Sequence, residues 1–420
     1  MLLVRICLLY LVPIDDKYIG FIKRGNSMRY KTVISGLART PMGGMQGALS
    51  PLSASNLGAY AVRGALERAG AASDKVDEVI MGCVLPAGQG QAPARQAAVG
   101  AEIPVSVPAT TINKMCGSGM KAVMMAHDSI GSENNELVVA GGMESMTNAP
   151  HILPKSRDGL RLGHGSLLDH MFCDGLEDAF DKGRLMGSFA EQCARKYSFS
   201  REAQDEFAIE SLKRAQRAIS QGDFEREIQP VVIKSKKGEI EIKEDEQPGK
   251  AQLDKIPHLR PAFEKDGSVT AANSSSISDG AAALILSSES YARDNNLSAQ
   301  ALLLAHATHA QEPSWFTTAP VKAIEKLLTK VGWSIGDVDL FEVNEAFAVV
   351  TMAAMRDLKI PHEKMNIRGG ACALGHPVGA SGTRIIVTLI HALQDHGLKR
   401  GVASLCIGGG EATAVAIELV

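Results

Sequence analysis

The pattern of apolar and polar positions in this chain repeats itself after 263 residues, as between Cys116 and Gly379. Apolar positions with helical spacing at 56–70 precede a strand-like run at 76–83, and the same succession returns at 319–332 and 338–345. The turns CGSG at Cys116 and GASG at Gly379 each open an apolar helix. Each helix leads to an apolar strand with glycines at its end, LVVAGGMES and SLCIGGGEAT, where the apparent offset is 267. The chain therefore predicts two copies of one structural unit.

Each copy has the order strand, helix, strand, which is typical of an α/β unit with parallel neighbouring strands joined by crossovers. We expect the two units to be related by a pseudo-two-fold axis. The two glycine-opened helices would then be equivalent, and their N-termini would face one cleft. In α/β sheets, ligands bind in the crevice at the carboxyl ends of the strands. The predicted fold class is a duplicated α/β fold with an inserted loop domain.

The segment 146–277 interrupts the repeat. It contains an amphipathic helix at 200–222, with Ser200 as its N-cap, and a charged run at 234–250 that predicts a solvated hairpin. We therefore expect an N-terminal domain formed by 28–145 and 278–297. A loop domain would occupy 146–277 and a C-terminal domain 298–420.

The first 27 residues differ from the rest of the chain. Their apolar stretch, from Ile6 to Pro13, is too short to cross a bilayer core of about 30 Å. As a signal peptide the segment lacks a clear small-residue cleavage site, and Asp15 and Asp16 follow it. We favour the interpretation that 1–27 is an extra segment with a mis-assigned start, because a regular first strand follows Met28.

Composition narrows the classes of protein. The chain has 420 residues, 45% of them hydrophobic, and a formal net charge of −3, so it lacks the basic excess that a nucleic-acid partner requires. Its seven cysteines are scattered, with no CxxC pair, which argues against a disulfide framework and against a metal site. A reducing, cytoplasmic location without a membrane partner is predicted.

Two residues on the repeated turns are candidates for nucleophilic chemistry. Cys116 begins a predicted helix, where free backbone N–H groups and the helix dipole favour a thiolate and should lower the pKa of the thiol. His376 precedes the equivalent turn, from which an imidazole can reach the thiol and take its proton. The alternatives are an inert buried cysteine and a turn histidine before Pro377.

Two further residues end predicted strands. Cys406 could move a proton next to a carbonyl group, or it could be an inert core cysteine. Asn344 could hold a water or an enolate oxygen, or it could simply terminate its strand. The residues alone leave both alternatives open.

Five segments together resemble the signature blocks of the thiolase family: NKMCGSGMKAV, GGMESMTNAP, VNEAFA, GGACALGHPVGASGTR and CIGGGEATA. They occur in the family's order and spacing from Met28 to Val420. The resemblance implies that Cys116 is the acylated nucleophile, that His376 activates it and that Cys406 is the second acid/base. It also implies that Asn344 holds an enolate through a water, and that the N–H groups of Cys116 and Gly408 form a second oxyanion site.

The resemblance also implies substrate contacts. The residues similar to those that line the pantetheine tunnel are Ser275, Met186, Phe347 and, near its mouth, Phe316. Leu185 stands where many short-chain members have histidine, and Leu212 stands where a potassium-activated subgroup has tyrosine, so no potassium requirement is expected. The arginine expected near the nucleotide phosphate is missing, and Lys250 or Lys255 is expected to replace it.

The segment 151–171 resembles the loop through which short-chain thiolases form tetramers, so a homotetramer is expected. The implied reaction is condensation of two acetyl-CoA to acetoacetyl-CoA and CoA, or the reverse thiolysis, by ping-pong kinetics without a cofactor. One alternative is a broad-range 3-ketoacyl-CoA thiolase of β-oxidation. Another is an inactive acyl-CoA or lipid-binding protein of the same fold. A ketosynthase is disfavoured because it would have two histidines where this chain has His376 and Asn344.

Overall fold

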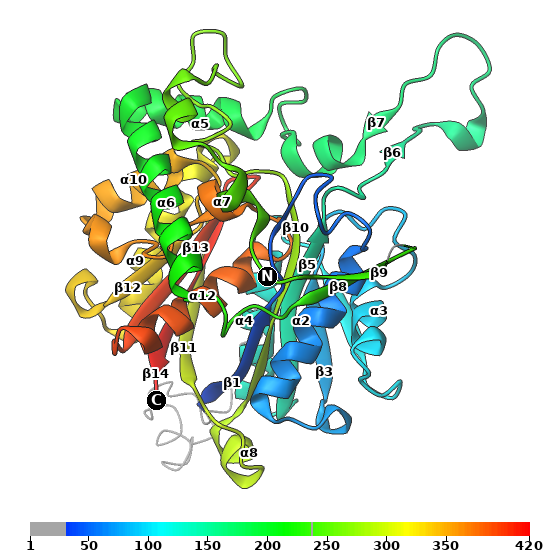
Figure 1. Ribbon diagram of the computed structural model, residues 1–420, viewed down its shortest axis with the longest axis vertical. Coiled ribbons are helices and arrows are strands. Elements are labelled where there is room, and N and C mark those ends of the chain that lie inside the picture. Colours follow the sequence, from blue (N-terminus) through cyan, green and yellow to red (C-terminus); the bar gives the residue numbers. More distant parts are fainter. Residues whose placement is uncertain (1–30, 237) are drawn as a thin grey trace, which may run out of the picture.

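The computed structural model describes residues 31–236 and 238–420, and the predicted extra segment 1–27 lies outside the described residues. One mixed sheet crosses the molecule in the order β12-β13-β14-β11-β1-β10-β5-β3-β4, with β2 beside β10 (Figure 1). Its strands are β1 (Thr32–Arg39), β2 (Gly43–Gly44), β3 (Glu78–Gly82), β4 (Ala109–Ile112), β5 (Leu137–Ser145), β10 (Ser278–Ser288), β11 (Ala301–Ala310), β12 (Leu340–Val343), β13 (Arg400–Ile407) and β14 (Glu411–Leu419).

Helices cover both faces of this sheet. They are α2 (Ala54–Ala69), α3 (Pro93–Gly100), α4 (Ser118–Gly131), α8 (Glu289–Asp294), α9 (Ala319–Val331), α10 (Ala348–Leu358), α11 (Ala371–Leu374) and α12 (Ser381–Asp395). The side chains of α4 and α12 pack in one hydrophobic core with strands of both halves. Helices α2 and α3 pack with the N-terminal strands on the other face, and α9 does so with the C-terminal strands. Because it is enclosed in this way, α12 is buried from Ser381 to Leu393.

The duplicated α/β fold is confirmed by the strand pairing. Both halves contain parallel strands, since β3 pairs with β5 and β4 in the first half and β12 with β13 in the second; the next strands, β10 and β14, are antiparallel to β5 and β13. The halves join where β1 and β11 pair antiparallel. Val138 lies beside Glu78 and Gly401 beside Leu340, so β5 and β13 are related by an offset of 263, and β3 and β12 by an offset of 262. The offset of 267 between the glycine runs is therefore wrong: one run lies inside β5 and the other follows β13.

The two glycine-opened helices meet at their N-termini, as the repeat predicts. A Cβ atom on Gly119 would lie 2.7 Å from Thr383 Oγ1 and 2.9 Å from the carbonyl oxygen of Gly379. A Cβ atom on Gly382 would overlap the backbone nitrogen of Met120. Backbone therefore packs on backbone at this point, which only glycine permits.

The segment between β5 and β10 contains α5 (Met186–Tyr197), α6 (Arg201–Gln221) and α7 (Glu246–Lys250). Ser200 caps α6 as predicted, since its Oγ accepts a hydrogen bond from Ala203 N. The first part of the charged run, 234–242, lies in the predicted hairpin, in which β8 (Val231–Ser235) pairs with β9 (Gly238–Ile242). The rest of the run is not a solvated hairpin, because it leads into α7 and its Asp245 is buried. Strands β6 (His151–Ile152) and β7 (Leu168–Asp169) form the base of an arm that reaches away from the body (Figure 1). No helix in the described part of the chain is long and apolar enough to cross a membrane.

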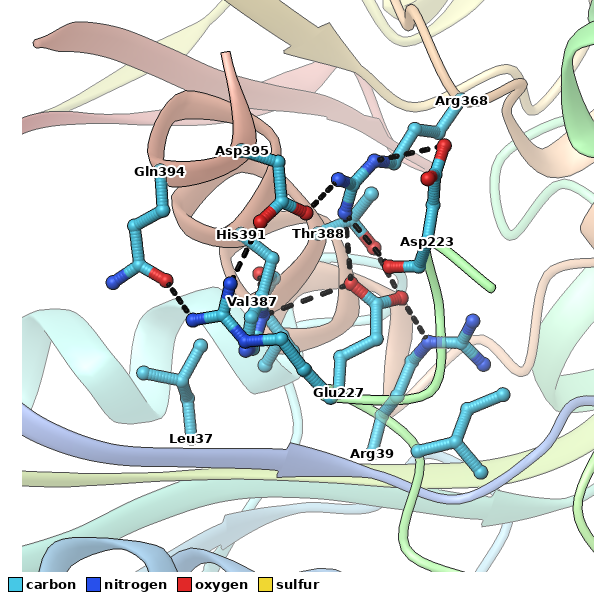
Figure 2. Close-up of polar contacts among 12 residues, drawn as sticks. Leu37, Arg39, Asp223, Glu227, Arg368, Val387, Thr388, His391, Gln394 and Asp395 are labelled. Atoms are coloured by element: carbon cyan, nitrogen blue, oxygen red, sulfur yellow. Dashed lines mark hydrogen bonds and ion pairs between the residues drawn. The ribbon is translucent and has the colours of Figure 1, made fainter. Parts of the chain in front are cut away.

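The buried carboxylate of Glu227 joins the segment between β5 and β10 to both halves of the fold (Figure 2). Glu227 Oε1 accepts hydrogen bonds from Arg39 Nε of β1 at 2.5 Å and from Thr388 Oγ1 of α12 at 3.1 Å. Its Oε2 lies 3.8 Å from His391 Nδ1 and 4.0 Å from a terminal nitrogen of Arg368. All five side chains are almost completely buried, so their charges depend on one another for solvation.

Replacement of Glu227 by alanine should lower the free energy of unfolding by about 3 to 5 kcal/mol, because buried Arg39 then loses one of its two carboxylate partners and the buried Thr388 hydroxyl loses its acceptor. Urea unfolding followed by circular dichroism measures this loss. The matched control is Arg226→Ala, which removes an exposed pair with Asp395 and should cost less than about 1 kcal/mol. Equal losses in the two variants would contradict an anchoring role for Glu227.

Candidate active site

A cavity of about 390 Å³ lies where the two halves and the inserted segment meet. Four predicted catalytic residues line it: Cys116, His376, Cys406 and Gly408. The predicted substrate contacts that also line it are Ser275, Met186, Phe316 and Phe347. Most of the remaining wall is apolar and includes Leu176, Leu185 and Phe263. The fold therefore brings together residues that are some 290 positions apart in the sequence.

Two of the substrate contacts also have partners within the protein. Phe316 is 3% exposed and packs edge-on against Phe189, so its ring is buried in the wall of the cavity. Ser275 already donates its hydroxyl hydrogen to the carbonyl oxygen of Ala346 at 3.0 Å. It can therefore only accept a hydrogen bond from a ligand without breaking this contact.

A strained turn places Cys116 directly before α4. Met115 adopts a left-handed conformation, with φ of 47°, which is uncommon for a residue other than glycine. Ser118 Oγ accepts from Lys114 N at 2.8 Å and donates to the carbonyl oxygen of Met115 at 2.6 Å, while Asn113 Oδ1 accepts from Met115 N. These hydrogen bonds hold the strained residue, and the sulfur points to the cavity.

Burial raises the pKa of the Cys116 thiol to about 11, although the N–H groups of Gly408 and Cys116 stabilise the thiolate. The predicted lowering of this pKa is therefore wrong, because desolvation outweighs these two N–H groups, one in the turn before α4 and one after β13. The same two N–H groups face the sulfur, where an oxyanion on an acyl group bound to Cys116 would lie. Cys116 is protonated at neutral pH and needs a base.

His376 has the protonation state and tautomer of such a base. Ser381 donates its hydroxyl hydrogen to the carbonyl oxygen of Pro377 at 3.0 Å, so its Oγ accepts from the nearby Nδ1–H of His376 at 2.5 Å. The lone pair is then on Nε2, which has no hydrogen-bond partner among the described residues. Burial, together with the charge of Arg384, lowers the pKa of His376 to about 3. The imidazole is therefore neutral.

Cys406 lies at the end of β13 and is completely buried. Burial raises the pKa of its thiol well above the usual value, and the nearby Cys116 thiol raises it further. Cys406 is therefore protonated at rest and can act first as an acid. It lies two residues before Gly408, so one strand end supplies both a proton donor and an oxyanion donor.

Asn344 follows β12, is 1% exposed and is not among the residues that line the cavity. Its backbone N–H donates to the carbonyl oxygen of Ser404 at 3.0 Å. Neither polar atom of its side-chain amide has a hydrogen-bond partner within residues 31–236 and 238–420. A buried amide without partners is costly unless a water or a ligand group satisfies it.

Sequence reasoning did not find two residues that position the site. Ser381 sets the tautomer of His376, and its only signal is its place five residues after the histidine. Glu144 is completely buried and accepts hydrogen bonds from Val84 N, Leu85 N and Gly379 N at 2.9 to 3.1 Å. It thereby links the turn that carries His376 to the other half of the fold. Burial raises the pKa of Glu144 to about 7.

The two predicted phosphate contacts lie in a second cavity of about 380 Å³. It shares Ala271 and Ser276 with the first cavity, so the two adjoin. Lys250 and Lys255 line this outer groove together with Leu212. Lys250 is paired with Glu246, whereas no ion pair is recorded for Lys255 within the described residues. No cluster of metal-ligating side chains occurs in the part of the chain that the structure covers.

Fold and cavity together define a class of enzyme, the acyltransferases that carry their acyl group on a cysteine of a duplicated α/β fold. The sequence matches the family described as Thiolase, N-terminal domain, over residues 32–290 and the family described as Thiolase, C-terminal domain, over residues 297–419. The chain belongs to the thiolase family.

Known relatives cover nearly the whole chain. It is 47% identical to an acetyl-CoA acetyltransferase of Cupriavidus necator, over 92% of this chain and 98% of that protein. It is 45% identical to a probable acetyl-CoA acyltransferase of Staphylococcus aureus, over 92% and 99%. The crystal structure of the Bacillus anthracis acetyl-CoA acetyltransferase matches with a TM-score of 0.91 and 40% identity, over 93% of this chain and 99% of that chain. An Ascaris suum thiolase in complex with coenzyme A matches with a TM-score of 0.87 and 41% identity, over 93% and 100%.

Replacement of Ser381 by alanine should slow acyl transfer to Cys116 by about tenfold or more, because His376 loses the acceptor that fixes its tautomer. The rate of acetyl exchange between acetyl-CoA and labelled CoA measures this step, and KM should change little. The low pKa of His376 keeps the imidazole neutral above about pH 5. The exchange rate of Ser381→Ala divided by that of the wild-type enzyme should therefore stay constant from pH 6 to 8.

Ser287→Ala is the matched control for this variant. Ser287 is also a completely buried serine that bonds a backbone carbonyl, but it lies in β10 away from the cavity. Its loss should leave exchange unchanged. Exchange at the wild-type rate in Ser381→Ala would show that the orientation of His376 does not depend on the serine.

Proposed function

We propose that this thiolase condenses two molecules of acetyl-CoA to acetoacetyl-CoA and CoA, and catalyses the reverse thiolysis, through an acetyl group on Cys116. The observation that carries the proposal is the meeting of Cys116, His376 and Cys406 in one cavity. The relatives named as acetyl-CoA acetyltransferases, at 40 to 47% identity, support the choice of acyl group. The thioesters are substrates, and thiolase chemistry needs no cofactor.

In the first half-reaction, Nε2 of His376 takes the proton of Cys116 and the thiolate attacks the carbonyl carbon of acetyl-CoA. The N–H groups of Cys116 and Gly408 hold the oxyanion of the tetrahedral intermediate. Its collapse breaks the bond to the CoA sulfur, which takes the proton of Cys406. The products are acetyl-Cys116, free CoA, a positively charged His376 and a Cys406 thiolate.

These charges prepare the second half-reaction. The Cys406 thiolate takes a proton from the methyl carbon of a second acetyl-CoA. The charged His376 and a water on Asn344 stabilise the resulting enolate oxygen. The enolate carbon attacks acetyl-Cys116, and the departing Cys116 sulfur takes back the proton of His376. Every group returns to its starting protonation state, and acetoacetyl-CoA leaves.

The proposed contacts for the rest of the substrate run from the first cavity into the outer groove. Ser275, Met186, Phe316 and Phe347 would surround the pantetheine arm and the acyl group. Lys255, which has no recorded ion pair in the described structure, is better placed than Lys250 to bind a nucleotide phosphate. Leu212 lines this groove where a potassium-activated thiolase has tyrosine, which supports the proposal that potassium is not required.

We also propose that the segment between β5 and β10 acts as a loop domain and that the enzyme is a cytoplasmic homotetramer. The six cysteines of the described residues are free thiols, which supports a reducing compartment. The arm between β6 and β7 carries Leu160, Leu162 and Leu167 at 52%, 99% and 65% exposure. Such exposed leucines favour contact with a second copy of the chain.

Mass spectrometry after incubation with acetyl-CoA tests the proposed intermediate. The Cys116 peptide of the wild-type enzyme should carry an acetyl group, and Cys116→Ser should lose it. Cys406→Ser should still be acetylated, but it should make acetoacetyl-CoA at least 100-fold more slowly, because it lacks the second base, a loss in the range of about 10²–10⁴ for general bases.

Cys193→Ser is the matched control, since Cys193 is buried in the same hydrophobic cluster as Cys406 but does not line the cavity. It should keep both acetylation and condensation. Condensation at the normal rate by Cys406→Ser would contradict the assignment of the second base. Absence of acetylation in the wild-type enzyme would favour the alternative of an inactive acyl-CoA binding protein.

Replacement of Leu162 by aspartate should weaken assembly, because a charge would replace an apolar side chain in the proposed contact between copies. Light scattering coupled to size exclusion should show smaller particles than the wild-type tetramer, with acetyl exchange retained. Ile240→Asp is the control, since Ile240 is 58% exposed on the β8–β9 hairpin and should leave the mass unchanged. A wild-type mass for Leu162→Asp, or a wild-type enzyme that is monomeric, would rule out assembly through this arm.

A further inference from the structure

Asn366 uses its whole amide to bind the end of β12. It is 3% exposed and adopts a left-handed conformation with φ of 46°. Its Oδ1 accepts from Val343 N at 2.9 Å, and its Nδ2 donates to the carbonyl oxygen of Val343 at 2.9 Å and to Glu345 Oε1 at 2.8 Å. Its backbone N–H donates to the carbonyl oxygen of Phe341 at 2.9 Å.

These hydrogen bonds replace those that a neighbouring strand would make with the outer edge of β12. β12 is the last strand on its side of the described sheet, so its outer edge has no neighbouring strand there. Met365 makes a single parallel bridge to Phe341, and Asn366 then supplies both a donor and an acceptor to Val343. Since Val343 directly precedes Asn344, the backbone of Asn344 is held between Ser404 on one side and Asn366 on the other.

Glu345 extends this contact on the other side of Asn344. Its carboxylate is buried and accepts from Asn366 Nδ2, from Ser211 Oγ at 2.7 Å and from Cys372 N at 3.1 Å. Three donors converge on it, so the site requires a group that only accepts. A Cβ atom on Gly370 would overlap this carboxyl group, which shows how closely the loop after Asn366 packs on it.

His376, in contrast, is held by other contacts. Its backbone N–H donates to the carbonyl oxygen of Ser276 at 3.1 Å, and its Nδ1 is bound by Ser381. Glu144 binds Gly379 N at the end of the same turn. Loss of the Asn366 amide therefore leaves these three contacts in place. The backbone at Val343 and Asn344, in contrast, loses the hydrogen bonds that hold its outer edge.

We propose that Asn366, together with Glu345, is a positioning residue for Asn344, and that carbon–carbon bond formation and cleavage depend on it while acyl transfer to Cys116 does not. The inference rests on the proposed function, in which Asn344 acts on the enolate and the N–H groups of Cys116 and Gly408 act on the tetrahedral intermediates. Removal of the Asn366 side chain should therefore slow carbon–carbon bond formation and cleavage but leave acyl transfer to Cys116 unchanged. A general loss of stability would instead slow both reactions.

The test uses Asn366→Gly in the full-length enzyme, because glycine accepts the left-handed conformation and removes only the amide. Two rates are measured: acetyl exchange between acetyl-CoA and labelled CoA, and thiolysis of acetoacetyl-CoA by CoA. We expect kcat for thiolysis to fall by roughly 10- to 100-fold, less than the 10²–10³ that outright loss of an oxyanion donor costs. Exchange should change by less than about threefold, and KM for CoA should stay near the wild-type value.

Two further variants calibrate this result. Asn344→Ala should show the same separation of rates with a larger loss of thiolysis. Asn135→Ala removes an amide that also makes two hydrogen bonds, to Glu78 and Ser129 far from the cavity, and should leave both rates unchanged. Parallel losses of exchange and thiolysis in Asn366→Gly, or no loss of either, would overturn the inference. A wild-type enzyme without exchange activity would instead overturn the proposed function.

Discussion

The close contact between α4 and α12 is the constraint on which the rest of the structure depends. Gly119 and Gly382 let the two helices touch at backbone distance, so the turns before them lie beside each other. One turn carries Cys116 and the other His376. A methyl group at either glycine would force the helices apart and, with them, Cys116 and His376. Duplication of one unit thus accounts for a pair of equivalent turns, of which one carries the proposed nucleophile and the other the proposed base.

Buried carboxylates hold the segments that this contact brings together. Glu144 ties the His376 turn to the N-terminal half, Glu345 binds the loop before α11, and Glu227 joins the inserted segment to both halves. Each carboxylate accepts hydrogen bonds from two or more segments that are distant in the sequence. By contrast, the Asn344 amide and His376 Nε2 are among the buried polar groups left without a partner in the described structure. They are the groups that a water or a thioester would satisfy.

Burial also sets the resting charges of the site. It keeps both thiols protonated and the imidazole neutral, so these three groups carry no separated charges. In the proposed mechanism, charges appear on these groups only after a thioester is bound and His376 takes the proton of Cys116. The cost of a buried ion pair is thereby avoided in the resting enzyme.

The repeat of 263 residues, the glycine-opened turns and the signature motifs are local patterns, and the sequence by itself therefore determined the duplicated fold, the cap of α6, the hairpin at the start of the charged run and several of the residues that line the cavity. It misjudged the pKa of Cys116, since helix position is visible in a sequence but desolvation is not. It also missed Ser381, Glu144 and Asn366, whose partners are often far away in the chain. Only the tertiary structure decided these, because hydrogen bonds and burial depend on which distant segments fold together.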